Sequence, residues 1–254
     1  MNKKTYSILG CGWLGLPLAK HFIAKDVVIK GSTTSEEKKV LLEAENIHPY
    51  VLNIDQENDF SDFLDTDVLL IMITSKKLEA YKSLVNEIEK SSVKKVIFIS
   101  STSVYPRNNK DYTEKDETID SLLSVVENIF RNNPHFTTTI IRFAGLYGDK
   151  RQPGNWFKDK KIPQPLGFVN MIHREDCIVI ISKIIDSQIF GETFNACVNH
   201  HPTRKDFYTH AKKSLGMPIP VFDDSQPLKF KTINPAKLIE RLDYKFIHND
   251  LLAI

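Results

Sequence analysis

The sequence predicts an α/β fold in which a doubly wound parallel sheet is followed by a smaller C-terminal part. In the first half of the 254-residue chain, short runs of apolar and β-branched residues alternate with longer amphipathic stretches, as in βαβ units that build a parallel sheet. Several short runs are continuously apolar, as expected for strands covered by helices on both faces. A glycine-rich turn directly follows the first run.

The expected elements follow from these patterns in chain order. Strands are expected at 6–9, 27–30, 50–53, 68–73, 95–100 and 138–143. Apolar residues at three- and four-residue spacing predict helices at 14–24, 78–90, 119–131, 175–185 and 204–215. Between 152 and 167, proline and glycine interrupt the rhythm, so loops that contact a ligand are expected there. We therefore expect a single domain, with the main sheet in 1–148 and a smaller lobe with late core elements in 149–254.

Composition excludes several classes of partner. The chain has 34 basic and 32 acidic residues and a net charge of +2, which is too small to predict binding to nucleic acid or an anionic membrane. The longest apolar runs fall well short of the roughly 20 residues of a membrane-spanning helix. Cys11, Cys177 and Cys197 lie far apart, so neither a metal site nor a disulfide framework is predicted. We expect a cytoplasmic protein with a small-molecule partner, and the sequence allows a homodimer.

The glycine-rich turn carries the strongest local signal. Its residues are Gly10, Cys11, Gly12, Trp13, Leu14 and Gly15, between a predicted strand and a predicted helix. In the GxGxxG fingerprint the first glycine makes a tight turn, the second lets the backbone approach a pyrophosphate, and the third lets helix and strand pack closely. This context predicts a Rossmann-type site for a nicotinamide dinucleotide within 1–148, although a plain glycine turn is the alternative reading.

The end of the second strand bears on the choice between NAD and NADP. An acidic residue about 20 positions beyond the glycines would bind the ribose hydroxyls of NAD. The chain has no acid there, and Lys30 is followed by the hydroxyl residues Ser32, Thr33, Thr34 and Ser35. Hydroxyls and a nearby lysine could serve a 2′-phosphate, so NADP is slightly preferred over NAD. Alternatively, Thr34 and Glu37 match a helix capping box.

Four further segments occur in the order of a known family. They are Ser-Ser-Thr-Ser-Val-Tyr at 100–105, Arg-Phe-Ala-Gly-Leu-Tyr-Gly at 142–148, Ile-His-Arg-Glu-Asp at 172–176 and Gly-Glu-Thr-Phe-Asn at 191–195. With the glycine turn, they make the chain resemble the extended short-chain dehydrogenase/reductases, the NAD-dependent epimerase/dehydratase group. The resemblance covers nearly the whole chain and implies an enzyme acting on a nucleotide-sugar or a similar polar substrate.

The resemblance also implies roles for individual residues. Ser101 would bind the reacting oxygen, with Tyr105 in a supporting position nearby. The residues implied at the cofactor, besides the glycine turn and 32–35, are Asp55, Thr74, Ser100 and Tyr147. Those implied at the substrate are Ser103, Arg142, Arg151, Asn155 and His173. A Ser/Thr-rich turn after a strand remains the alternative for 100–105, and Asp55 could equally begin a turn.

One departure from the family weakens the enzyme hypothesis. Members that transfer hydride carry Tyr-x-x-x-Lys on the helix after the fifth strand, where the lysine lowers the tyrosine pKa. Counted back from Glu127, these positions hold Ile119 and Leu123. Tyr208 and Lys212 have the same spacing, but on a late helix, where chance explains it. Tyr105 is the best substitute that the sequence offers. We therefore predict an atypical epimerase, dehydratase or reductase, or alternatively a non-catalytic NADP(H)-binding sensor or scaffold.

Overall fold

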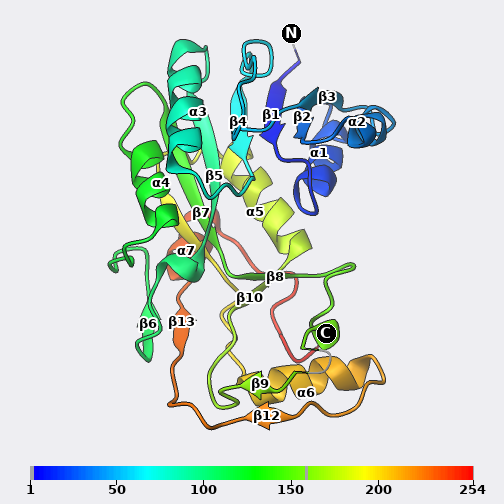
Figure 1. Cartoon of the computed structure of the whole chain (residues 1–254), viewed down its shortest axis with the longest axis vertical. Helices are drawn as coiled ribbons and strands as arrows, with labels where there is room; N and C mark the ends of the chain where they lie inside the picture. Colours follow the sequence, from blue (N-terminus) through cyan, green and yellow to red (C-terminus); the bar gives the residue numbers. More distant parts are fainter. Residues whose placement is uncertain (1–2, 158–159, 254) are drawn as a thin grey trace. The chain divides into compact units, whose positions relative to one another are not determined.

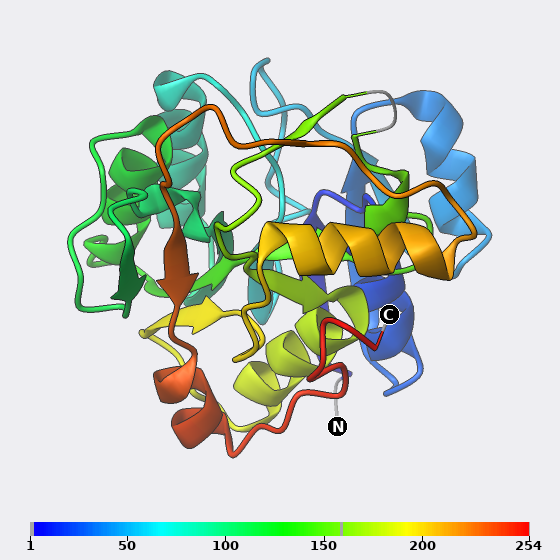
Figure 2. The same cartoon turned by 90° about the horizontal axis from the view of Figure 1, so that it is seen from below.

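A computed structural model describes residues 3–157 and 160–253 (Figures 1 and 2). The chain forms two compact units that interleave along the sequence. Unit 1 comprises Met1–Ser100, Asp120–Ile141 and Ile184–Thr193, and unit 2 comprises Ser101–Ile119, Arg142–Lys183 and Phe194–Ile254. A single boundary at residue 148 was expected instead. The difference arises because the chain enters unit 2 three times, at Ser101, Arg142 and Phe194, rather than once.

The main sheet has seven strands in the order β11-β7-β5-β4-β1-β2-β3, which confirms the predicted α/β class. Its strands are β1 (Thr5–Leu9), β2 (Val28–Thr33), β3 (His48–Val51), β4 (Val68–Ile71), β5 (Lys95–Ser101), β7 (Thr137–Phe143) and β11 (Thr193–Ala196). Strand β1 pairs in parallel with both β2 and β4, and β4 with β5. All four residues of β4 are buried, as expected for a strand covered on both faces.

Seven helices occur within the described residues: α1 (Gly15–Ile23), α2 (Glu36–Glu43), α3 (Leu78–Lys90), α4 (Leu122–Arg131), α5 (Arg174–Asp186), α6 (Arg204–Ser214) and α7 (Ala236–Leu242). Helix α4 begins three residues later than the sequence predicted. Ser121 is its N-cap and accepts a hydrogen bond from the Ser124 amide, so the preceding residues stay outside the helix. None of the helices in this part of the chain is long and apolar enough to span a membrane.

Helices α3 and α4 lie side by side in Figure 1 and cover the apolar core of unit 1. The rings of Phe98 on β5 and Phe130 on α4 are stacked with their centroids 5.1 Å apart. Tyr81 on α3 meets both rings edge-on. Because these side chains are almost completely buried, their packing is a principal source of stability for this unit.

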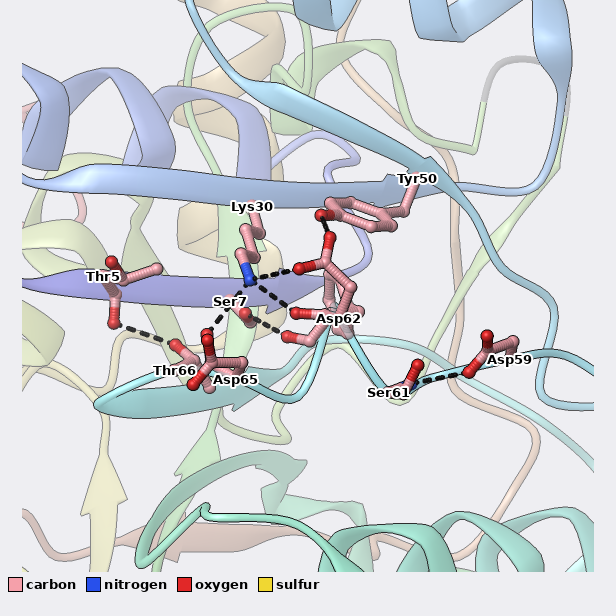
Figure 3. Close-up of polar contacts among 10 residues, drawn as sticks. Thr5, Ser7, Lys30, Tyr50, Asp59, Ser61, Asp62, Asp65 and Thr66 are labelled. Carbon is pink, nitrogen blue, oxygen red and sulfur yellow. Dashed lines mark hydrogen bonds and ion pairs between the residues drawn. The ribbon is translucent and has the colours of Figure 1, made fainter.

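Side chains of β1 and β2 fix the loop that leads into β4 (Figure 3). Lys30 donates hydrogen bonds to the carbonyl oxygens of Asp62 and Asp65, at 2.5 and 3.1 Å. The buried Ser7 hydroxyl donates to the Phe63 carbonyl oxygen at 2.6 Å. Tyr50 donates to the Asp62 carboxylate, and this bond together with Lys30 lowers the pKa of Asp62. The Lys30 ammonium is thus a structural clamp.

Unit 2 contains short strands that the sequence analysis did not predict. They are β6 (Lys110–Tyr112), β8 (Gly145–Tyr147), β9 (Ile162–Pro163), β10 (Met171–His173), β12 (Phe222–Asp223) and β13 (Lys231–Ile233). Within the unit they pair in parallel as β8 with β10, β9 with β12 and β6 with β13. In Figure 2 the orange segment after α6 runs back along that helix. Strands of two or three residues carry too little periodicity to be recognised from sequence.

The aromatic stack of unit 1 gives a stability prediction. Phe130→Ala should lower the free energy of unfolding by about 3–5 kcal/mol, because it removes a fully buried ring and leaves a cavity. Lys82→Ala, on the exposed face of α3, is the control and should change it by less than about 0.5 kcal/mol. Urea unfolding of the three proteins measures both effects. Equal stabilities for the two variants would contradict the packing described for this core.

Candidate functional site

The three glycines of the turn after β1 differ in the space around them. Gly10 has φ +107°, and a β-carbon there would lie 2.8 Å from the Ile73 side chain. A β-carbon at Gly15, in the first turn of α1, would overlap the Gly10 carbonyl oxygen. Around Gly12 no atom lies within 4 Å of the added carbon. The turn and the close packing thus require Gly10 and Gly15, whereas Gly12 leaves open space in front of the backbone, as binding of a pyrophosphate requires.

Ser32 holds this turn in place from the neighbouring strand. Its buried hydroxyl accepts a hydrogen bond from the Gly10 amide at 2.9 Å, and its carbonyl oxygen accepts one from the Cys11 amide at 2.8 Å. Burial raises the pKa of the Cys11 thiol to about 12, so the thiol stays protonated and unreactive at neutral pH. Trp13 is half-buried, and Leu14 is the buried N-cap of α1. The Ser32 hydroxyl, which was expected to contact a cofactor, therefore holds the glycine turn in place.

The end of β2 differs from the prediction in two respects. Lys30, expected near a 2′-phosphate, has its ammonium in the loop clamp of Figure 3. The capping box of Thr34 and Glu37 is also wrong, because α2 begins at Glu36 with Ser35 as its N-cap. The Ser35 hydroxyl is buried and has no hydrogen-bond partner among the described residues. Hydroxyl groups thus remain at this strand end, but the expected lysine does not.

Three other residues expected at a cofactor also lie in unit 1. The Asp55 carboxylate accepts a hydrogen bond from the Ser75 hydroxyl at 2.6 Å, and Asp55 lines a groove of about 770 Å³. Thr74 is exposed in the segment after β4. Ser100 is buried and donates to the Glu127 carboxylate at 2.5 Å. The Ser100 side chain is thus tied to α4, whereas Asp55 and Thr74 remain accessible.

In unit 2, Ser101 and Ser103 line a pocket of about 260 Å³. Ser101 is the N-cap of the 3-10 turn η1 (Thr102–Val104), and its hydroxyl accepts a hydrogen bond from the Ser103 amide at 3.1 Å. Four cationic residues line the same pocket: Arg107, Arg204, Lys229 and Lys231. The sequence analysis singled out none of these four, because they come from three separate segments and form no motif.

Tyr105 and Arg142 lie together in a buried part of unit 2. The Tyr105 side chain is 1% exposed, and its hydroxyl donates to Asn195 Oδ1 at 2.9 Å and accepts from Arg142 Nη1 at 2.5 Å. Burial also raises the pKa of this phenol. Neither Tyr105 nor Arg142 lines the pocket. Both are therefore parts of a buried polar network, and their assignment to catalysis and to the substrate stays a prediction.

The remaining expected residues of unit 2 lie away from this pocket. Tyr147 is buried, and its ring meets the His173 ring edge-on at 5.0 Å. His173 also contacts His248, with ring centroids 3.6 Å apart. Arg151 and Asn155 are exposed near the turn η2 (Pro153–Asn155). None of Tyr147, His173, Arg151 and Asn155 is among the residues that line the pocket. The assignment of Tyr147 to the cofactor and of the other three to the substrate therefore stays a prediction.

The positions of the missing tyrosine and lysine have structural roles here. Ile119 lies before α4, and its amide donates to the Val104 carbonyl oxygen at 2.8 Å. Leu123 is on α4 and packs against the apolar core of unit 1. Lys212 is buried on α6 and donates to the Gly154 carbonyl oxygen at 3.2 Å, so the spacing of Tyr208 and Lys212 does not form a second dyad.

No protein-family model matches the chain. Protein YeeZ of Escherichia coli strain K12 is 30% identical over 270 residues, in an alignment that covers 99% of this chain and 98% of YeeZ. The chain belongs to the YeeZ family. The name of this relative states no activity.

Solved structures show the same fold for this YeeZ-family chain. A functionally unknown conserved protein from Silicibacter pomeroyi DSS is 17% identical, with a TM-score of 0.84 over 99% of this chain and 96% of that one. A putative NAD-dependent epimerase/dehydratase from Methylobacillus flagellatus is 19% identical, with a TM-score of 0.78 over 99% and 96%. UDP-glucuronic acid 4-epimerase from Bacillus cereus, solved with UDP-glucuronic acid and NAD, is 18% identical, with a TM-score of 0.80 over 98% and 96%. These likenesses confirm the predicted epimerase/dehydratase fold.

The glycines of the YeeZ-family chain give a paired prediction. Gly12→Val should abolish dinucleotide binding and leave the melting temperature close to wild type, because its side chain enters only the open space. Gly15→Ala is the matched variant and should destabilise the protein by about 1–3 kcal/mol through its overlap with Gly10. Calorimetric titration and thermal melting separate the two effects. Unchanged dinucleotide affinity in Gly12→Val would reject the cofactor site.

Proposed function

We propose that the chain binds a nicotinamide dinucleotide at the glycine turn and a small anionic substrate of the nucleotide-sugar class in the pocket of unit 2. The observation that carries this proposal is the geometry of the turn after β1. Gly10 and Gly15 are required by the backbone itself, and Gly12 faces open space. That combination fits a pyrophosphate at the N-terminus of α1, where backbone amides and the helix dipole favour negative charge.

The pocket supports the substrate half of the proposal. Four cationic residues line it, and Ser101 and Ser103 supply hydroxyl groups. Such a lining favours an anion that also carries polar groups, as a sugar phosphate does. When bound, the nicotinamide ring supplies the chemistry of accepting or donating a hydride. The Ser101 hydroxyl would orient the reacting oxygen by a hydrogen bond.

A second candidate function is a non-catalytic sensor or scaffold that holds NADP(H). It is favoured by the side chains at the dyad positions, since Leu123 is part of an apolar core and Ile119 has no ionisable group. A protein without these groups would lose the general acid–base help that is typically worth about 10² to 10⁴ in rate. The two candidates agree on dinucleotide binding and differ on turnover.

The preference between cofactors is part of the proposal. We expect NADP(H) to bind slightly more tightly than NAD(H), because β2 ends in hydroxyl residues and not in a carboxylate. The difference should be below about tenfold, since the Lys30 ammonium is held by the 62–65 loop and charged hydrogen bonds supply most of such selectivity. Thermal shifts should reveal either cofactor, because a ligand at a hundred times its dissociation constant adds about 2.7 kcal/mol. Tighter binding of NAD(H) in calorimetry would reject the preference.

Turnover separates the enzyme from the sensor. In a panel of nucleotide-sugars with bound cofactor, Ser101→Ala should lower epimerisation or hydride exchange by about 10² to 10³, because it removes a hydrogen bond to the reacting oxygen. Ser103→Ala is the matched control, since the Ser103 backbone amide still donates to Ser101. Its rate of epimerisation or hydride exchange should fall less than that of Ser101→Ala. Both variants should keep the wild-type dinucleotide affinity. Activity that survives Ser101→Ala would refute its assigned role, and a wild type that turns over no substrate of the panel would favour the sensor.

A further inference from the structure

Lys231 occupies an unusual position in the pocket of unit 2. It is the first residue of β13, and its ammonium donates to the carbonyl oxygens of Thr102 and Tyr105, both at 2.6 Å. The Thr102 carbonyl also accepts the Tyr105 amide of the same turn. Lys231 thus holds the two ends of the turn that follows Ser101. Ser101 and Lys231 line one pocket. A ligand bound there would therefore contact both the turn and the ammonium group that holds it.

The hydrogen-bond capacity of this ammonium exceeds what the chain uses. A lysine ammonium has three donors, and the described residues provide two acceptors for it. The third N–H is therefore available to a ligand in the pocket. Asn170 adds a complementary group, since its Nδ2 donates to the Lys231 carbonyl oxygen while its Oδ1 is buried and accepts no hydrogen bond among the described residues. An anion that also carries a hydroxyl group fits both atoms.

We propose that Lys231 is the charge-determining residue of this pocket, whose ammonium binds the anionic group of the substrate while it fixes the Ser101 turn, so that anion affinity depends on its protonation. This inference rests on the proposed function, because it takes the pocket to be the substrate site. Lys231 would then supply a lysine cation beside Ser101 in a chain that lacks the usual tyrosine–lysine dyad. The cation comes from a strand more than 100 residues away in sequence.

The surroundings of Lys231 make its charge adjustable. Burial and, to a smaller extent, the positive charge of Arg107 lower the pKa of Lys231 to about 8. Three other cations line the same pocket: Arg107, Arg204 and Lys229. The paired strand β6 adds Lys110, which forms an ion pair with Asp116, and Asp111. The Asp111 carboxylate accepts hydrogen bonds from Thr232 and Asn234. The two carboxylates are thus held by other partners. Lys231 is protonated below about pH 8 and loses its charge above it, so anion affinity should fall as the pH rises through this value.

Sulfate is a suitable probe because it stays a dianion throughout the range needed. Its affinity for the full-length protein would be measured by calorimetry from about pH 6.5 to about pH 9.5, which brackets the Lys231 transition. Wild type should lose about tenfold in affinity across the range, as expected for one charged hydrogen bond. Lys231→Arg should bind sulfate without this pH step, since a guanidinium stays protonated. Lys231→Met should bind weakly at every pH.

Lys229→Met is the matched control, since it removes another cation of the same pocket. It should weaken sulfate binding and keep the pH step of the wild type. A wild-type profile without a step near pH 8, or a step that persists in Lys231→Arg, would overturn the role of Lys231 and leave the pocket intact. Absence of sulfate binding by the wild type at every pH would instead refute the anion pocket of the proposed function, and the Lys231 inference with it. If Lys231→Arg fails to fold, Lys231→Met takes its place, because a pH step that persists in that variant would equally overturn the role of Lys231.

Discussion

The contact between the backbone of α1 and the turn after β1 is the constraint on which the candidate cofactor site depends. Gly15 lies so close to the Gly10 carbonyl oxygen that a β-carbon cannot be placed between them. This contact brings the N-terminus of α1 to the end of the strand, where its backbone amides can face an anion. Ser32 then fixes Gly10 from the neighbouring strand through its buried hydroxyl. Cofactor recognition at the proposed site would therefore depend on backbone geometry, which explains why so few side chains of the turn carry chemistry.

The sequence predicted the architecture of the sheet well because the alternation of apolar strand segments with amphipathic helical segments determines the order of its elements. Helix α3 was predicted with the bounds that the structure shows, since its apolar spacing covers several turns. Strand β2 extends three residues beyond the prediction, through Thr33, because Gly31 is of a residue type that strands disfavour and made the strand appear to end before it. The pairing of β2 with β1 and β3 supplies what local preference does not. Helix α4 was predicted to begin three residues too early because Ser121 was not recognised as its N-cap.

The polar residues were harder to assign because the function of a polar side chain depends on its hydrogen-bond partners in the folded protein. Tyr105 follows a serine-rich strand end, which made it a reasonable candidate from sequence. Only the fold reveals that Arg142 and Asn195 enclose its hydroxyl. Lys30 was similarly assigned to a phosphate from its place in the sequence, yet its side chain holds a loop. In both cases burial of the polar group requires partners within the protein, and no local pattern identifies those partners.

The requirement that a buried polar group has partners within the protein also distinguishes structural from functional groups in unit 2. Tyr105 and Lys212 are buried with their polar atoms bound to the protein. Lys231 differs from them because it is only half-buried and because it borders a pocket. A lysine in this position gives up hydration without gaining a carboxylate, so the protein bears a cost in stability to keep a cation there. Such a cost is the kind that functional sites carry. The proposed binding of an anion explains such an amine better than packing does, since an apolar side chain would serve packing at lower cost.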